Sequence, residues 1–289
     1  DMAPFDMLLY AGVVFGWSTS WLPLKWQLGV VVPEISLFWR FLMAAPMMAF
    51  LAIMSGQSLR FNWRVHWRFA ALGIFIFSGN FTLFYHAASG VASGLLAVVF
   101  STASLVNVLM GAALGRQRPA MQHLLAAFVG ISGVALLYWP ELQLSETALP
   151  SLMLCLVGTL FFCSGNMVSA ASQRRGIPVF ASTAWGMAYG ACYLGLVSFV
   201  MGYEFMIERT PLYVGSLMWL TIISSVMTFS CYLMLIGKIG ASRAGYATVI
   251  FPVFALLIST GFENYHWTLL GIAGLGLVVA GNIIMMRAR

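Results

Sequence analysis

The sequence predicts an all-α polytopic membrane protein with ten transmembrane helices, arranged as two inverted five-helix repeats. Three observations lead to this prediction. Charged residues make up only 8% of the 289 residues, ten apolar runs are long enough to cross a bilayer, and markers of the first half recur in the second. A soluble domain carries roughly 25% charged residues because its surface faces water. Lipid must therefore be the main solvent of this chain.

The ten apolar runs fill nearly the whole chain. A helix needs about 20 mainly apolar residues to cross the hydrocarbon, and a barrel strand needs only about 9–11, so runs of this length favour helices. The first run has no basic leader and no cleavage site of small residues, which favours a retained helix over a signal peptide. The predicted spans are 6–27, 34–54, 67–88, 91–114, 120–139, 150–172, 179–201, 211–236, 242–262 and 267–286.

The basic residues predict which helix ends face the cytoplasm. With the N-terminus inside, eleven of the fourteen Lys and Arg residues fall on the inner side, two fall outside and Arg40 lies within the second run. Short cytoplasmic loops carry such an excess of Lys and Arg. We therefore expect a bacterial inner-membrane protein with both termini in the cytoplasm. The net charge of +6 reflects this topology and predicts no nucleic-acid partner.

Markers of the first half return at a nearly constant spacing, which indicates a duplicated unit over 1–140 and 150–289. Five helices are an odd number, so the second unit starts on the opposite side of the membrane. Inverted repeats of this kind are characteristic of secondary transporters. The recurring pairs are Ser78 and Ser225 and Tyr85 and Tyr232 at a spacing of 147, Gly90 and Gly240 at 150, and Gly133 and Gly281 at 148.

Three segments resemble the EamA-type carriers of the drug/metabolite transporter superfamily: RFLMAAP (40–46), 85–138 and 232–286. Within that superfamily the chain looks most like amino-acid exporters of the YddG type, aromatic amino acids included. FSTAS (100–104) and Arg116 depart from the family, which usually has a proline and a glutamate there. The resemblance implies export from the cytoplasm. It also implies a structural pairing for Arg40, with binding of a substrate carboxylate as the alternative.

Polar and aromatic residues of the first run share one helical face. Trp17 and Trp21 are four residues apart with Ser20 between them. We expect this face to line an aqueous pathway and to contact a small amphipathic solute. The alternative is an interfacial position for Trp21 and a helix-packing role for Ser20.

The third and eighth helices carry related polar and aromatic faces. Ser78 and Tyr85 are two turns apart in the third helix, and Tyr232 repeats the tyrosine in the eighth. Asn80 is costly in lipid unless it finds a partner or water. We expect these residues at a site near the midplane. Asn80 could instead join two helices as a structural hydrogen bond.

A polar stripe runs along the fourth helix. Ser101, Ser104 and Asn107 recur every three residues, and the counterpart helix carries Tyr246. A single serine can return its hydroxyl to the preceding turn at little cost, but a stripe that ends in asparagine favours a face toward the lumen.

The sixth and seventh helices add two candidates. Asn166 lies opposite the first helix under the predicted inverted symmetry, so we expect it in the same site. Trp185 is four residues before Tyr189, and this aromatic pair faces either the site or lipid.

The predicted function is a secondary transporter that exports neutral or zwitterionic metabolites, above all amino acids, aromatic ones included, by alternating access around an uncharged polar-aromatic cavity. No Asp or Glu lies in the middle of a run, and neither an HExxH nor a GxxxxGK[ST] motif occurs, which disfavours a membrane protease or an ATPase. A carrier of drugs or of other metabolites with the same fold is the alternative, and sugar-nucleotide or triose-phosphate cargo would need a basic midplane. The non-transport alternative is a membrane-embedded enzyme, which would need a catalytic group of His and carboxylate residues that the sequence does not show. We expect no cofactor and no metal, a small-molecule substrate, surrounding lipid, and a monomer or weak dimer.

Overall fold

The computed structural model describes residues 3–114, 118, 120–239 and 247–287. Within these residues the regular structure is helical, without strands, and nine helical stretches are long and apolar enough to cross a membrane. The shorter apolar helix Ala247–Phe262 is a tenth. The described chain therefore confirms the prediction of an all-helical polytopic membrane protein.

The helices follow the predicted runs closely, and several runs are divided into shorter elements. The elements before residue 145 are α1 (Pro4–Ser18), α2 (Trp21–Trp26), α3 (Pro33–Met54), η1 (Trp63–Val65), α4 (His66–Ile74), η2 (Phe75–Asn80), α5 (Phe81–Ala87), α6 (Ser93–Ser101), α7 (Ala103–Ala113) and α8 (Met121–Leu144). The later elements are α9 (Ala148–Arg174), α10 (Val179–Val200), α11 (Pro211–Met218), η3 (Trp219–Met227), α12 (Thr228–Ile239), α14 (Ala247–Phe262) and α15 (Leu269–Arg287).

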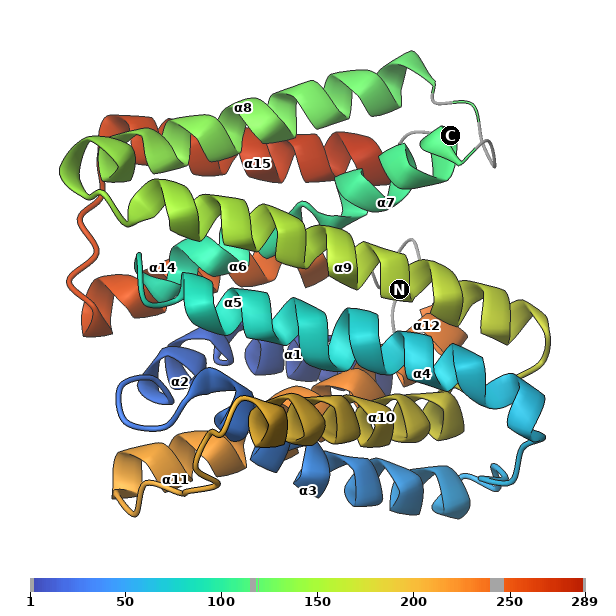
Figure 1. Ribbon diagram of the computed structural model, residues 1–289. Coiled ribbons are helices and arrows are strands. Elements are labelled where there is room, and N and C mark those ends of the chain that lie inside the picture. The colour runs from blue at the N-terminus through green and yellow to red at the C-terminus, as the bar shows by residue number, and fades with distance from the viewer. Residues whose placement is uncertain (1–2, 115–117, 119, 240–246, 288–289) are drawn as a thin grey trace.

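The helices run roughly side by side and give the molecule two ends (Figure 1). We call the end where α1 begins and α15 finishes the terminus end, and the opposite end, with the turn from α8 to α9, the far end. Arg64, Arg174 and Arg287 lie in the first or last turns of helices at the terminus end. Glu34 and Glu263 lie at the far end, so the charges divide between the two ends as the sequence suggested.

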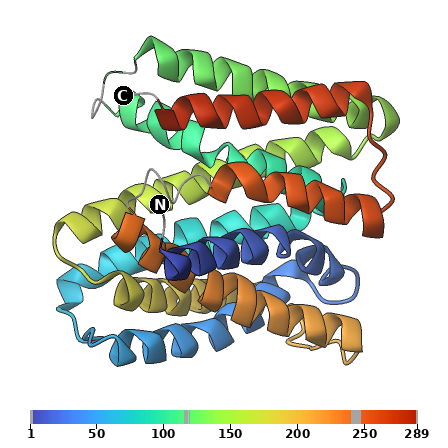
Figure 2. The ribbon, with the colours of Figure 1, turned by 180° about the vertical axis from the view of Figure 1, so that it is seen from behind.

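Two helix pairs form opposite edges of the bundle. Helix α8 packs along α15 at one edge, and α3 packs along α10 at the other (Figures 1 and 2). Between these edges lie the contacting pairs α1 with α12, α6 with α14 and α5 with α9. Large apolar side chains such as Phe128 and Phe199 are exposed on the outside, where lipid would cover them.

Four of the apolar runs are interrupted near their middle. The run predicted as one helix over 6–27 is divided at Thr19 and Ser20, and the fourth run is divided at Thr102. The third and eighth runs each contain a π-helical segment, η2 and η3. Interruptions of this kind are frequent at functional sites. They change the direction of nearby side chains and leave some backbone carbonyls without their intrahelical hydrogen bonds.

Candidate functional site

A cavity of about 670 Å³ lies between helices of both halves of the chain and reaches the terminus end. We call it the terminus-side cavity. Its described lining combines aromatic, aliphatic, hydroxyl and amide side chains, and Arg174 is the one charged residue among them. The residues that line it are Trp17, Leu72, Ile76, Phe77, Phe100, Ser101, Ala103, Ser104, Asn107, Phe162, Asn166, Ser169, Ala170, Gln173, Arg174, Val179, Thr183, Phe229, Tyr232, Leu233, Thr248 and Met286.

A second, much smaller space of about 50 Å³ lies toward the far end. We call it the closed pocket. Four aromatic residues line both spaces and form the boundary between them: Trp17, Phe100, Phe162 and Phe229. The other residues of the closed pocket are Ser20, Trp21, Leu24, Arg40, Asn80, Phe81, Phe84 and Ser224.

The break between α1 and α2 positions the first residues of the site. The Ser20 hydroxyl donates to the Gly16 carbonyl and lies 2.6 Å from the Ser224 hydroxyl of η3. The Trp17 ring packs on Tyr232, with centroids 4.9 Å apart, and so lies against α12. The Trp21 ring is buried between Phe84 and Phe100, each 5.4 Å away.

The polar stripe of the fourth run is held by a residue that the sequence did not single out. Asn282 of α15 accepts a hydrogen bond from the Ser104 hydroxyl at 3.0 Å, and its amide donates to the Ser101 hydroxyl at 3.4 Å. Asn282 is 1% exposed. By contrast, the half-buried amides of Asn107 and Asn166 line the terminus-side cavity without a hydrogen bond to the described chain, so both are available to a solute.

Arg40 is buried in α3 and lines the closed pocket. Its Nε donates to the Ser225 hydroxyl at 2.9 Å, and Nη1 donates to the Tyr85 hydroxyl at 3.5 Å. Its guanidinium lies over the Phe81 ring, 4.6 Å from the centroid. The family resemblance implied a structural pairing for Arg40, with binding of a substrate carboxylate as the alternative, and the structure shows no acidic partner for it among the described residues.

The structure brings most of the predicted site residues to the two spaces. Nine of them line one or both: Trp17, Ser20, Trp21, Asn80, Ser101, Ser104, Asn107, Asn166 and Tyr232. Tyr246 lies outside the described residues. The sequence analysis predicted Phe229 on the face of the eighth helix with Tyr232 but missed Phe100 and Phe162, since aromatic residues are common on every face of these helices.

Three predicted residues lie away from both spaces. The Ser78 hydroxyl donates a hydrogen bond to the Gly73 carbonyl at 2.6 Å, five residues earlier, as expected in the π-helical segment η2. Tyr85 is fully buried and accepts from Arg40. The Trp185 indole donates to the Leu59 carbonyl at 2.9 Å and lines a separate apolar pocket against α3.

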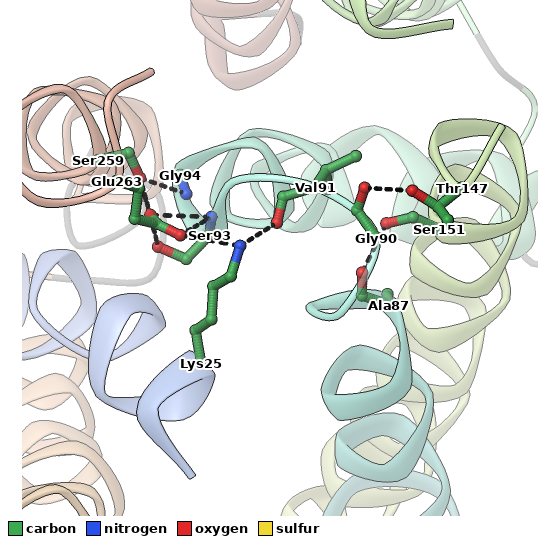
Figure 3. A network of polar contacts seen from close by, with 10 residues as sticks. All are labelled: Lys25, Ala87, Gly90, Val91, Ser93, Gly94, Thr147, Ser151, Ser259 and Glu263. Carbon is green, nitrogen blue, oxygen red and sulfur yellow. Dashed lines mark hydrogen bonds and ion pairs between the residues drawn. The ribbon is translucent and has the colours of Figure 1, made fainter. Parts of the chain in front are cut away.

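The far end is tied together by a polar network around the connection between α5 and α6 (Figure 3). Lys25 forms an ion pair with Glu263 at 3.1 Å and donates to the Val91 carbonyl at 2.8 Å. Glu263 also accepts from the backbone and hydroxyl of Ser93 and from the Ser259 hydroxyl. Helices α2, α6 and α14 are thereby joined at this end.

The same connection is held from its other side by α9. Thr147, the residue before α9, donates through its hydroxyl to the Gly90 carbonyl at 2.8 Å, and the Ser151 hydroxyl donates to the Ala87 carbonyl at 2.7 Å (Figure 3). A Cβ on Gly90 would lie 2.8 Å from the Thr147 carbonyl oxygen, so glycine permits this approach. These contacts join the helix ends at the far end, while the cavity is lined by Gln173 and Arg174 in the last turn of α9 at the terminus end.

Burial by itself would raise the pKa of Glu263. The hydrogen bonds from Ser259 and Ser93 and the positive charge of Lys25 outweigh burial and hold that pKa below its ordinary value. Glu263 is therefore a stable carboxylate at neutral pH, and the network that it centres is intact there.

The sequence profile of the EamA-like transporter family matches residues 5–139 and 149–287. An "uncharacterized transporter" of Archaeoglobus fulgidus is 23% identical over 282 residues, which are 98% of this chain and 99% of that protein. Protein PagO of Salmonella typhimurium is 22% identical over 265 residues, 89% of this chain and 84% of that protein. A crystal structure that is 18% identical has a TM-score of 0.69 and covers 98% of this chain and 96% of its own, which shows a shared fold.

Proposed function

Because this chain belongs to the EamA-like transporter family, we propose that it exports neutral or zwitterionic metabolites, above all amino acids, aromatic ones included. The observation that carries this proposal is the composition of the terminus-side cavity. Its volume of about 670 Å³ lies within the usual range of small-molecule sites, about 300–1,000 Å³. Its lining offers rings, hydroxyls and amides with a single charge, which suits a solute that is itself amphipathic and carries no large net charge.

The transport cycle that we propose is alternating access between two inverted five-helix units, 1–140 and 150–289. The separate matches of the family profile to residues 5–139 and 149–287 support the duplicated unit. A cavity that reaches one end, beside a network that joins helices at the other, is what one state of such a cycle requires. With both termini in the cytoplasm of a bacterial inner membrane, as the charges predict, this state would receive substrate from the cytoplasm.

Trp17→Ala is expected to lower amino-acid flux in proteoliposomes at least tenfold, because Trp17 has the largest side chain of the four aromatic residues that line both spaces. Asn166→Ala is expected to lower flux less, because it removes one amide from the cavity. Flux of labelled phenylalanine is measured with and without a pH gradient.

The matched control is Trp63→Ala, since Trp63 is an exposed tryptophan in η1 that lines neither space. It should retain wild-type flux. The folded fraction of each variant is checked by size-exclusion chromatography. Wild-type flux in both Trp17→Ala and Asn166→Ala would reject the cavity as the transport site, and absence of amino-acid flux in the wild-type protein would reject the substrate class.

A further inference from the structure

Arg40 is a buried cation without an acidic partner among the described residues. It is 2% exposed, and its contacts are two hydroxyls, from Ser225 and Tyr85, and two aromatic rings. The one acidic residue on the same helix, Glu34, is paired with His86 at 2.9 Å. Burying a charge is costly unless it is paired and hydrogen-bonded. Arg40 therefore has a buried positive charge that an anionic group of a ligand would stabilise.

Two further polar groups of the closed pocket lack partners. The Asn80 side-chain oxygen and the Trp21 indole nitrogen are both buried, and neither has a hydrogen-bond partner among the described residues. Both residues line the closed pocket together with Arg40. Unpaired buried polar groups are rare because each loses its hydrogen bonds to water without gaining others in exchange. Three residues with unmet hydrogen-bonding or charge requirements therefore line one small space, which favours a polar ligand there.

The pattern of these groups matches the polar end of an α-amino acid. A carboxylate accepts hydrogen bonds, and a guanidinium and an indole N–H donate them. An ammonium donates, and the Asn80 side-chain oxygen accepts. The closed pocket, about 50 Å³, has room for a few atoms, since one water needs about 10–15 Å³ on the same measure. An aromatic side chain does not fit in it.

Building on the proposed function, we infer that Arg40 binds the substrate's carboxylate in the closed pocket. The ammonium lies against Asn80, and the side chain of the substrate remains among the four boundary aromatics. The substrate class is then α-amino acids and related monocarboxylates. Amines and other cations without a carboxylate are rejected, because the unpaired guanidinium repels them. Charge-assisted pairing of this kind is about twice as strong as a neutral hydrogen bond.

Equilibrium binding to the purified full-length protein in nanodiscs tests this assignment, measured by isothermal titration calorimetry. The ligands are phenylalanine, 3-phenylpropionate, which lacks the ammonium, and phenylalaninamide, which lacks the carboxylate. Wild-type protein should bind phenylalanine at least tenfold more tightly than the amide. Arg40→Gln should weaken phenylalanine and 3-phenylpropionate about 10- to 100-fold. It should not weaken the amide, because the substitution also removes the guanidinium that repels the amide's ammonium.

Arg40→Lys should retain part of the preference for carboxylates, because it keeps the charge but loses the two-pronged geometry. The control variant is Arg64→Gln, since Arg64 lies in η1 at the terminus end and lines neither space. It should bind all three ligands as the wild-type protein does.

An equal loss of acid and amide binding in Arg40→Gln would mean that Arg40 only supports packing, and would overturn the inference. Equal binding of phenylalanine and phenylalaninamide by the wild-type protein would overturn it too, even if Arg40→Gln did not fold. If the wild-type protein bound both ligands equally but still transported phenylalanine in proteoliposomes, the proposed function would hold and only the role of Arg40 would be rejected. Arg40-dependent binding of 3-phenylpropionate without any amino-acid flux would uphold the assignment and reject the proposed function.

Discussion

We expect Glu263→Gln to open the far end of the bundle and to expose the closed pocket there. The substitution removes the ion pair with Lys25 and weakens the hydrogen bonds from Ser93 and Ser259. A hydrogen bond to a charged group contributes about 1.5–3 kcal/mol, so losing even one shifts the population of the open state about 10- to 100-fold.

Labelling of a cysteine at position 224 measures this opening. Ser224 is buried in the closed pocket, and Ser224→Cys in a background without the four native cysteines should react slowly with an impermeant maleimide added to whole cells. Glu263→Gln should react at least tenfold faster. The control Glu146→Gln changes an exposed carboxylate at the same end and should leave the rate unchanged. Equal rates in all three proteins would contradict closure by this network.

The same reporter should respond little to mild acid. Because the folded-state pKa of Glu263 is held below its ordinary value, the stabilisation is complete above the usual glutamate pKa of about 4.3 and is lost only as pH falls through the lowered value. Lys25 is the charged group that faces Glu263 from α2. Labelling between pH 5.5 and 7.5 should therefore stay constant once corrected for maleimide reactivity. A rise toward pH 5.5 would contradict this pKa.

Gly274→Leu is expected to prevent stable folding, because α8 and α15 touch through their backbones. A Cβ at Gly274 would lie 2.6 Å from the Gly133 carbonyl oxygen and 2.7 Å from the Leu137 nitrogen. Backbone atoms cannot move aside as a flexible side chain can, so the helices must separate. We expect a cost of about 3 kcal/mol or more, at the upper end of overpacking effects.

The control for this substitution lies two residues further along the same helix. Gly276→Leu adds the same side chain where nothing lies within 4 Å of the added Cβ, so it should fold like the wild-type protein. Thermal unfolding in detergent, followed by size-exclusion chromatography, compares the two. Equal midpoints for Gly274→Leu and Gly276→Leu would show that this crossing tolerates separation.

Composition and pattern were enough for the architecture because lipid imposes simple rules on the chain. Length and apolarity indicated the membrane helices, and low charge excluded a soluble domain. The candidate site was less accessible to the same reasoning. Trp17, Asn107 and Asn166 were found because polar or amphipathic residues are conspicuous in an apolar run. Asn282 was missed because it stands alone in its helix, and its partners Ser101 and Ser104 are 181 and 178 residues away.

Residues that recur at the same spacing in the two halves have different surroundings in the structure. Tyr85 and Tyr232 are 147 residues apart, yet Tyr85 is sealed against Arg40 while Tyr232 lines the terminus-side cavity beside Trp17. Ser78 and Ser225 lie in corresponding π-helical segments, but only Ser225 accepts from Arg40. A repeat in sequence therefore does not assign a repeat in function.

The sequence by itself determined that this chain is an all-helical membrane protein and where its helices run, because those properties depend on local apolarity and length. Only the tertiary structure decided that Glu263 joins three helices at one end, that four aromatic residues lie between two spaces, and that Arg40 is buried with no acidic partner in the described part of the chain. These features depend on side chains far apart in the sequence, and the interruptions within helices set where those side chains point.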